Sequence, residues 1–328
     1  MLHIMLSSLL LLAGLGILIA GGELLVRGAT MLSARLRVAP VIVGMTVVAF
    51  GTSTPELVVN LTAALRGDSA IGFGNVVGSN IANIGLLLAI TALAYPMVIH
   101  RSIVSREIPM MMLASAAIVV LGLNSLTEGT SDRFTRGDGL MLLLLFGVFL
   151  YYTLADAIHQ HDSDQLFPNP AKTTGSQPRS ASVLRTLILI GVGLGLLIIG
   201  GILTVRGGIG LARTVGIPEV IVGLTLIAVG TSLPELATSM IAVRRGHPDM
   251  AVGNIVGSNI FNLLFIWGLS IVIAPTDLPV GGRVDLLVMT GFAAVLLPMA
   301  LTQRRISRLE GGLLLLGYIG YMLWLALR

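Results

Sequence analysis

Residues 44–83 read GMTVVAFGTSTPELVVNLTAALRGDSAIGFGNVVGSNIAN, and residues 223–262 read GLTLIAVGTSLPELATSMIAVRRGHPDMAVGNIVGSNIFN. The two stretches align without a gap at an offset of 179 residues and are identical at 20 of 40 positions. Apolar composition alone gives a small fraction of that identity, so the chain contains an internal duplication. Each copy carries two polar blocks, Gly-Thr-Ser-x-Pro-Glu and Gly-Asn-x-Val-Gly-Ser-Asn-Ile-x-Asn, inside apolar sequence.

The duplication extends beyond these 40 residues. At the same offset, Gly16, Gly21, Gly22, Val26, Arg27 and Gly28 match Gly195, Gly200, Gly201, Val205, Arg206 and Gly207. Downstream, 136–139 resembles 308–311 at an offset of 172. Each repeat therefore covers five predicted spans, and because five is odd the second copy must enter the membrane upside down. Inverted repeats are common in secondary transporters, whose substrate site lies at the midplane between the copies.

The composition is that of a membrane protein. The 328 residues are 55% hydrophobic and 11% charged, with a mean hydropathy of +0.95, whereas soluble domains are about 25% charged. A soluble enzyme, a disordered chain and a nucleic-acid-binding module are thereby excluded. The absence of Cys excludes disulfides, thiolate metal sites and Cys nucleophiles.

Ten apolar stretches are long enough to cross a bilayer, since a span needs about 20 residues. They lie near 4–26, 39–65, 70–95, 104–123, 139–157, 184–206, 217–243, 249–274, 285–302 and 311–327. The predicted fold is an all-α polytopic membrane protein with ten transmembrane helices in two inverted five-helix repeats. The first stretch lacks a basic segment before it and matches an internal segment of the repeat, which favours a span over a signal peptide.

A polar stretch divides the chain. We expect a first five-helix repeat at 1–157, a cytoplasmic linker at 158–183 and a second, inverted repeat at 184–328. The linker's prolines and polar residues are typical of a loop, and its His159 and His161 lack a third metal ligand at a supporting spacing. Cytoplasmic connections are enriched in Lys and Arg, and placing both termini outside puts 13 of the 20 basic residues inside. The predicted location is the cell (inner) membrane.

Two glutamates lie deep in predicted spans. Glu56 and Glu235 are near the middle of the second and seventh spans, whereas other acids such as Glu23 and Glu107 are near span ends. An ionisable group at membrane depth is costly and indicates function.

A proline precedes each of these glutamates. In a helix interior, proline removes one N–H and clashes with the carbonyl four residues back, which here belongs to Gly51 or Gly230. We therefore predict a broken helix with free carbonyl oxygens in each repeat. Such backbone is tolerated at depth only where it lines a cavity or is buried in protein.

The second block predicts a polar helix face. Ser79 and Asn83, like Ser258 and Asn262, are four residues apart and share a face. Asn75 and Asn254, one turn earlier, either extend this stripe as ligands or act as bundle partners.

The remaining asparagines of the block are expected to face elsewhere. Asn80 and Asn259 point about 100° away from the stripe. They are predicted to form interhelical hydrogen bonds that hold the bundle.

These residues together make an all-oxygen ligand set without a deep His or any Cys. Such a set suits hard cations such as Ca²⁺, Na⁺, Mg²⁺ and Mn²⁺ rather than Zn²⁺ or Cu⁺. Ca²⁺ accepts about 6–8 oxygens in flexible geometry, while Mg²⁺ requires tight octahedral geometry. Two carboxylates can balance one Ca²⁺ or be shared by Na⁺ ions or protons, which permits exchange.

The paired blocks resemble the α-repeats of the cation/Ca²⁺ exchanger superfamily, in particular the prokaryotic Na⁺/Ca²⁺ exchangers, over essentially the whole chain. The resemblance implies a secondary active antiporter that exchanges Na⁺ for Ca²⁺ by alternating access in the lipid bilayer, with no prosthetic cofactor, no nucleic acid and no obligatory protein partner. It also implies that spans 2, 3, 7 and 8 surround the ions while spans 1 and 6 slide. Gly16, Gly21, Gly195 and Gly200 would then form smooth sliding surfaces.

The resemblance places ion ligands at six positions in each repeat. They fall on Ala49, Thr52, Ser53, Glu56, Ser79 and Asn83, and on Ala228, Thr231, Ser232, Glu235, Ser258 and Asn262. The alanines would act through their carbonyls, and the glutamates would hold Ca²⁺ with the two threonine carbonyls. The serines and outer oxygens would complete the Na⁺ sites. Some members, including K⁺-dependent ones, carry Asp where this chain has Asn262, so the pair of asparagines resembles K⁺-independent exchangers.

Other functions fit the residues less well. Exchange coupled to H⁺, or exchange of another divalent cation, stays open within the transporter class. An intramembrane hydrolase would need a metal motif or a nucleophile with a base, and the sequence has no HExxH pattern. A channel arises more naturally from oligomeric rings of charge than from an inverted repeat within one chain.

Overall fold

The computed structural model describes residues 2–99, 103–127, 129, 131–166, 182–214, 229–303 and 305–327. The first half contains the helices α1 (Leu2–Leu36), α2 (Pro40–Val43), α3 (Ala49–Thr52), α4 (Thr54–Arg66), α5 (Ser69–Ala82), α6 (Ala89–Ala94), α7 (Ile108–Gly122), α8 (Asn124–Thr127) and α9 (Arg136–Leu166). The second half contains α10 (Val183–Thr214), α12 (Leu233–Arg244), α13 (Pro248–Ile260), α14 (Trp267–Ile273), α15 (Gly282–Gln303) and α16 (Arg308–Leu327).

Short π-helical segments and strands complete the described elements. The π-helical segments are Gly44–Val48, Asn83–Leu88, Ile103–Glu107 and Phe261–Ile266. The strands are β1 (Met97–Val98), β2 (Arg133–Phe134), β3 (Thr276–Asp277) and β4 (Arg305–Ile306).

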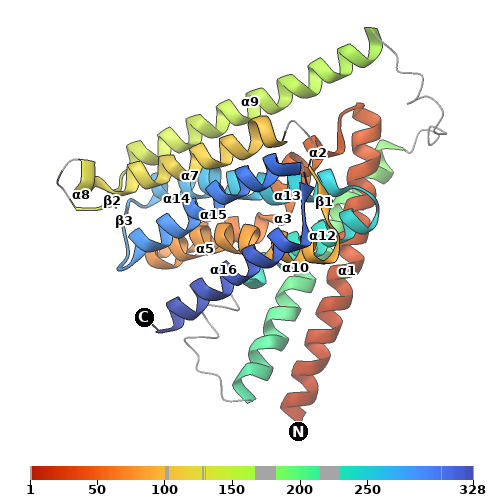
Figure 1. The fold of residues 1–328 in the computed structure, drawn as a ribbon. Helices are drawn as coiled ribbons and strands as arrows, with labels where there is room; N and C mark the ends of the chain where they lie inside the picture. The colour runs from red at the N-terminus through yellow and green to blue at the C-terminus, as the bar shows by residue number, and fades with distance from the viewer. Residues whose placement is uncertain are drawn as a thin grey trace.

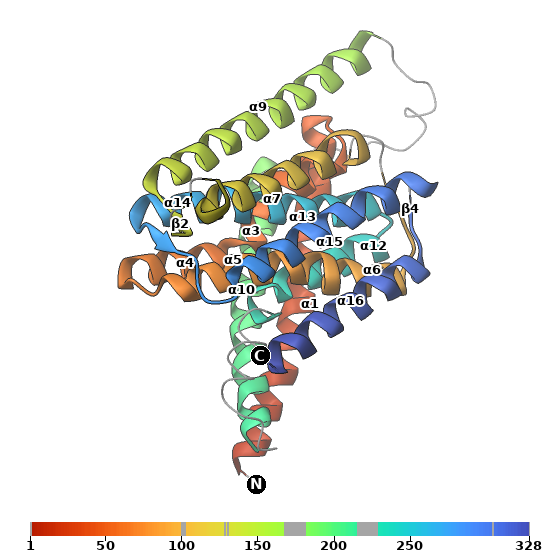
Figure 2. The same ribbon diagram turned by 60° about the vertical axis from the view of Figure 1, so that its left-hand side comes forward.

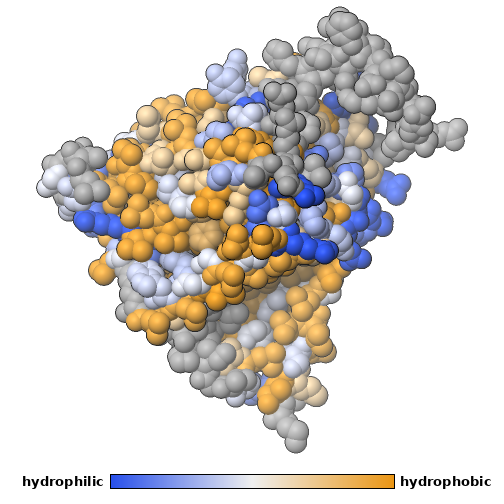
Figure 3. Space-filling view, in the orientation of Figure 1, coloured by the Kyte–Doolittle hydropathy of each residue, from blue (hydrophilic) through white to orange (hydrophobic). Residues whose placement is uncertain are grey.

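The helices form a body and a crossing pair. Helices α5, α7, α13 and α15 run side by side in the body, while α1 and α10 lie together and cross it steeply (Figures 1 and 2). Orange, apolar side chains cover the surface over α7, α15 and α16, whereas blue, polar side chains gather at the two ends of the body (Figure 3). An apolar belt between polar ends is the surface that a bilayer requires.

The expected spans are present wherever the structure describes them. Among the described residues, eight helices are long and apolar enough to cross a membrane, and the bent pair Pro40–Thr52 and Thr54–Arg66 makes a ninth. Helix α12 lies at the repeat offset from α4 and belongs to the seventh expected span, of which 217–228 lies outside the described residues. The predicted all-α polytopic fold is therefore confirmed.

Two small sheets join the halves at opposite ends of the body (Figure 1). β1 pairs antiparallel with β4, and β2 pairs antiparallel with β3. The offset of 179 carries β1 onto β3, and the offset of 172 carries β2 onto β4. Met97 pairs with Ile306 in one sheet, and the residues at the corresponding positions, Thr276 and Phe134, pair in the other. The two sheets are therefore equivalent under the internal duplication.

Helices α1 and α10 touch backbone to backbone. A Cβ added at Gly21 would lie 2.8 Å from the amide nitrogen of Leu197, and one at Gly200 would lie 2.7 Å from that of Leu18. The glycines of this contact recur every seven residues in both helices, at Gly14, Gly21 and Gly28 and at Gly193, Gly200 and Gly207. The absence of a side chain at these positions is what allows the close approach.

The four glycines expected on the sliding surfaces of spans 1 and 6 do not share one surface: Gly21 and Gly200 lie between these two spans, and Gly16 and Gly195 lie elsewhere. Gly16 and Gly195 have no heavy atom within 4 Å of an added Cβ, so they do not lie in a packed surface. Both sit five residues before a contact glycine, Gly21 or Gly200, and five residues is about 1.4 turns of helix. They therefore face away from the α1–α10 contact.

Three helices are longer than the sequence predicted. Helix α1 has 35 residues and α10 has 32, so each is about 50 Å long at 1.5 Å per residue and exceeds the roughly 30 Å of hydrocarbon. Helix α9 continues to Leu166, so the first part of the expected linker, including His159 and His161, is helical, while 167–181 lies outside the described residues. A helix normally ends before the residue that precedes proline, here Pro168.

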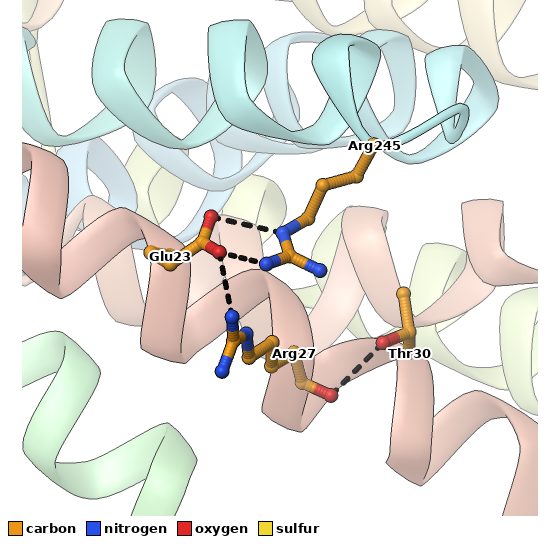
Figure 4. Close-up of polar contacts among 4 residues, drawn as sticks. All are labelled: Glu23, Arg27, Thr30 and Arg245. Atoms are coloured by element: carbon orange, nitrogen blue, oxygen red, sulfur yellow. Dashed lines mark hydrogen bonds and ion pairs between the residues drawn. The ribbon is translucent and has the colours of Figure 1, made fainter.

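The length of α1 changes the position of Glu23. The residue is in mid-helix rather than near a helix end. Its carboxylate accepts hydrogen bonds from Arg27 one turn later (3.1 Å) and from Nε of Arg245 at the end of α12 (2.9 Å), as Figure 4 shows. The hydroxyl of Thr30 bonds the Arg27 carbonyl in the same view. Glu23, expected near the end of the first span, therefore lies inside α1 with its charge paired.

Candidate cation-binding site

The predicted helix breaks are present in both repeats. Ser53 (φ −82°, ψ 9°) separates α3 from α4, and Ser232 (φ −88°, ψ 3°) precedes α12. These angles lie in the sparsely populated bridge region. Pro55 and Pro234 fall in the first turn of the helix that follows, where a missing N–H is tolerated. In the first repeat the axis bends by 46° at this point.

Each break residue bonds the glutamate of the other repeat. The Ser53 hydroxyl donates to Oε1 of Glu235 (3.0 Å), and the Ser232 hydroxyl donates to Oε1 of Glu56 (3.4 Å). Glu56 is 1% exposed and Glu235 is 0% exposed. The reciprocal bonds bring the two carboxylates to one place between the repeats.

Helices α5 and α13, with the π-helical segments that follow them, add polar side chains to this place. Ser79, Asn83, Ser258 and Asn262 are all buried. The side-chain atoms without a hydrogen-bond partner include Oε2 of both glutamates, Oγ of Ser79 and Ser258, Oδ1 of Asn83, and Oδ1 and Nδ2 of Asn262. A buried polar atom without a partner costs roughly 1–3 kcal/mol and calls for an explanation such as an ion.

In the second repeat, the amide of Asn254 and the hydroxyl of Ser239 lie beside Glu235. Asn254 accepts a hydrogen bond from the Thr52 hydroxyl (3.2 Å) and donates to Oγ of Ser239 (3.1 Å) and to the Glu235 carbonyl (3.4 Å). Its partner in the first repeat, Asn75, donates to the Glu56 carbonyl (3.5 Å). Both amides therefore brace the backbone of the glutamates.

Asn80 and Asn259, the asparagines expected to face away from the polar stripe, form different hydrogen bonds. Asn259 accepts a hydrogen bond from Nδ2 of Asn83 (2.9 Å) and donates to the sulfur of Met111 on α7 (3.4 Å), so the predicted interhelical role is present. Asn80 instead donates to the Val76 carbonyl of its own helix (2.7 Å). The Asn83 oxygen is thereby turned away from Asn259, while Asn262 has no such partner.

Two predicted alanine positions differ in what the structure describes. Ala49 is fully buried, and its carbonyl accepts hydrogen bonds from the Ser53 N–H (3.0 Å) and the Thr52 hydroxyl (3.4 Å). Ala228 lies outside the described residues. Thr231 is described and helical beside the second break.

Sequence reasoning missed three buried polar residues near the glutamates. Asn60, Thr238 and Ser239 are all 0% exposed. Asn60 and Ser239 follow Glu56 and Glu235 by four residues and so share their helix face. Asn60 donates to the Glu56 carbonyl (2.9 Å), and its Oδ1 has no partner. The spacing of four residues from each glutamate is the signal that could have identified the pair.

The two sides of the site are not alike. A cavity of about 370 Å³ lies between α4 and α10 and is lined by Val58, Val59, Gly201, Val205, Thr231 and Pro234, among others. On the repeat-related side, α1 packs directly on α12. A Cβ added at Gly22 would lie 2.7 Å from Ile241, whereas at the equivalent Gly201 the nearest such atom is 3.8 Å away.

Comparison with known proteins decides the family. The model of the sodium/calcium exchanger protein family matches residues 6–155 and 185–327. The chain belongs to this family. It is also 37% identical over 320 residues to the putative antiporter CaxA of Alkalimonas amylolytica, covering 96% of this chain and 97% of that protein. The predicted membership of the superfamily is thereby confirmed, and the protein is a transporter rather than an enzyme.

Two further relatives agree over the whole length. The inner membrane protein YrbG of Escherichia coli strain K12 is 35% identical, over 98% of this chain and 97% of its own. A solved structure of the sodium-calcium exchanger NCX_Mj, soaked with Na⁺ and Ca²⁺, superimposes with a TM-score of 0.79 at 29% identity, covering 96% of each chain. The fold is thus that of a multi-pass antiporter with ten helices in inverted repeats.

Proposed function

We propose that the protein exchanges Na⁺ for Ca²⁺ by alternating access, with the ions bound at the midplane between the two repeats. The observation that supports this most strongly is the reciprocal pair of bonds, Ser53 to Glu235 and Ser232 to Glu56. They bring two carboxylates together, and each leaves one buried oxygen without a partner. Two negative charges surrounded by neutral oxygens match one Ca²⁺ or more than one Na⁺.

The proposed ligands are those of the paired blocks. They are Ala49, Thr52, Ser53, Glu56, Ser79 and Asn83 in one repeat and Ala228, Thr231, Ser232, Glu235, Ser258 and Asn262 in the other. The carboxylates take Ca²⁺, and the serine and asparagine oxygens extend the set to Na⁺. Because Ser53 and Ser232 donate to the carboxylates in this structure, their hydroxyls rotate toward the cation when it binds.

The inverted repeat supplies the two states that exchange needs. In this structure a cavity lined by Thr231 lies on the α4–α10 side, whereas α1 is packed on α12 on the repeat-related side. Exchanging the conformations of the two repeats gives the opposite state, as in other transporters built from inverted repeats. Na⁺ and Ca²⁺ compete for the same carboxylates, so each leaves only when the other can replace it.

The proposed location is the cell (inner) membrane with both termini outside. The excess of Lys and Arg on the connections assigned to the cytoplasm supports this orientation. The relative YrbG is described as an inner membrane protein. Na⁺ entering down its gradient would then drive Ca²⁺ in the opposite direction.

The test is ⁴⁵Ca²⁺ uptake into proteoliposomes with three interiors: Na⁺, then K⁺ or choline at the same pH, then an acidic interior without Na⁺. We expect uptake only with internal Na⁺, and its loss in Glu56→Gln. Uptake that follows the proton gradient and ignores Na⁺ would instead establish H⁺-coupled exchange.

A matched control separates the site from charge in general. Asp277 is an exposed carboxylate that pairs with Arg133 at 3.4 Å in the β2–β3 sheet. Asp277→Asn removes one negative charge far from the candidate site and should retain uptake. Equal loss in both variants would show that the flux does not report on Glu56.

A further inference from the structure

The inter-helix contact of Glu23 has no repeat counterpart. At the offset of 179, Arg27 corresponds to Arg206 and Arg245 corresponds to Arg66, but Glu23 corresponds to Ile202. The arginines are thus duplicated, whereas the acid occurs once. We call the end of α12 at Arg245 the Arg245 face and the end of α4 at Arg66 the Arg66 face.

The ion pair joins the crossing pair of helices to the body. Nε of Arg245 donates to Oε2 of Glu23 at 2.9 Å, and a terminal guanidinium nitrogen contacts Oε1 (Figure 4). A planar guanidinium that meets both carboxylate oxygens is the favoured geometry for such pairs. Helix α1 supplies the acid and the end of α12 supplies the base, so the pair forms only while these helices are packed together.

The pair lies on the side where α1 is packed on α12. Beside it, Gly22 packs on Ile241 of α12. On the Arg66 face, where Ile202 replaces the acid, the cavity of about 370 Å³ separates α10 from α4 and Ile202 lines it. The helices are packed together on the side that has the acid and are separated by a cavity on the side that lacks it.

We propose that Glu23 and Arg245 are positioning residues that hold α1 on α12 and thereby favour closure of the cation site at the Arg245 face. The contact stabilises one packing of the helix pair on the body and has no equivalent at the repeat-related positions, where Ile202 replaces the acid. The exchanger therefore spends more time accessible from the Arg66 face. The apparent affinity for cations is consequently higher on that face.

The size of the effect follows from the exposure of the pair. The side chains of Arg245 and Glu23 are 33% and 34% exposed. Ion pairs this accessible to water contribute modestly, and the equilibrium between the two states should shift about two- to fivefold when the pair is lost. The pair therefore biases the transport cycle without locking it.

The natural absence of Cys makes a direct test possible. Single cysteines are placed at Ile241→Cys, in the α1–α12 contact, and at Val59→Cys, in the α4–α10 cavity. Their modification by a membrane-impermeant methanethiosulfonate is timed in proteoliposomes, with and without Glu23→Gln or Arg245→Gln. Because the reagent reports accessibility rather than ion flux, the result does not depend on which ion is coupled.

We expect either charge-removing variant to speed modification at Ile241→Cys about two- to fivefold and to slow it at Val59→Cys, since exposed pairs of this kind contribute little more. The swapped pair Glu23→Arg with Arg245→Glu should restore the original rates. Arg27→Gln is the matched control, because Arg27 also contacts Glu23 (3.1 Å) but lies on the same helix. It should leave both rates unchanged.

Two outcomes would overturn the proposal. One is an unchanged rate at Ile241→Cys in both charge-removing variants. The other is a change that Arg27→Gln reproduces or that the swapped pair fails to reverse, which would indicate a general structural role. The proposal rests on the proposed function only in requiring alternating access, so loss of Na⁺-driven uptake in the unmodified protein would refute the coupling ion and leave this test intact.

Discussion

The helix pair α1–α10 has two kinds of interface, and they differ in symmetry. Between the two helices, Gly21 approaches the backbone of Leu197 and Gly200 approaches that of Leu18 at almost equal distances, 2.8 and 2.7 Å. Against the body, α1 is packed on α12 whereas α10 stands off from α4 across a cavity. The internal interface is symmetric and the external one is not.

This difference separates what is fixed from what moves. Glycines bring the backbones of α1 and α10 together without intervening side chains, so we expect the two helices to move as one unit. In the proposed transport cycle the pair moves as a whole between two repeat-related places on the body, of which it occupies one in this structure. Glu23 is the residue proposed to favour that place.

The largest expected effect is on the symmetric interface. Gly193→Ala places a Cβ 2.6 Å from the amide nitrogen of Leu25 and 2.9 Å from the Gly21 carbonyl. Backbone atoms cannot rotate away, so the substitution should destabilise the protein by about 1–3 kcal/mol. Thermal unfolding in detergent measures this loss. Gly195→Ala is the control, since nothing lies within 4 Å of its added Cβ, and equal destabilisation by both would contradict the assigned interface.

The next effect concerns closure. Gly22→Leu would push against Ile241 and prevent α1 from packing on α12. Gly201→Leu would fill the cavity between α4 and α10 and prevent α10 from packing on α4. Each should lower exchange about tenfold, within the range for overpacked interfaces. Gly22→Leu and Gly201→Leu should favour opposite states of the exchanger. The rates of cysteine modification at Ile241→Cys and Val59→Cys distinguish these states. The same accessibility change in both variants would contradict the two-place description.

A smaller effect is expected inside the site. Asn259→Leu removes the acceptor that holds the Asn83 amide at 2.9 Å. Loss of one buried hydrogen bond should raise the Na⁺ concentration that gives half-maximal exchange about two- to tenfold. This concentration is measured from the Na⁺ dependence of ⁴⁵Ca²⁺ exchange. Asn80→Leu is the repeat-related control, because the Asn80 amide donates to the Val76 carbonyl of its own helix. A larger effect of Asn80→Leu than of Asn259→Leu would reverse the assignment.

The smallest effect would transfer the ion pair to the other face. Ile202→Glu places an acid opposite Arg66, at the positions equivalent to Glu23 and Arg245. It should raise occupancy of the state closed at the Arg66 face about two- to fivefold, seen as slower modification at Val59→Cys. Ile202→Gln, which has similar size without charge, should not change the rate. Acceleration by the acid would contradict the proposal.

Much of the architecture was predictable because the duplication carries it. The offset of 179 residues located both helix breaks and both polar faces. The offset of 172, found in the sequence at 136–139 and 308–311, also relates β2 to β4, although the strands themselves were not predicted. These features are repeated with their sequence. A pattern that occurs twice is easier to recognise than the same residues once.

What could not be predicted depends on contacts between distant residues. The ends of α1 were misplaced because Glu23 and Arg27 look like the end of a span until Arg245, 222 residues away, supplies a partner. Gly16 was not distinguishable from Gly21 without knowing which face meets α10. Asn259, unlike Asn80, also bonds Met111 on α7, which lies outside the two aligned 40-residue stretches.

The most direct test compares the two carboxylates that the repeats bring together. Na⁺-driven ⁴⁵Ca²⁺ uptake is measured in Glu56→Gln, Glu235→Gln and Asp277→Asn proteoliposomes made with equal amounts of folded protein. If one site is shared between the repeats, both glutamate variants lose uptake to background and Asp277→Asn retains it. Near-normal, Na⁺-driven uptake in either glutamate variant would contradict a site that requires both carboxylates.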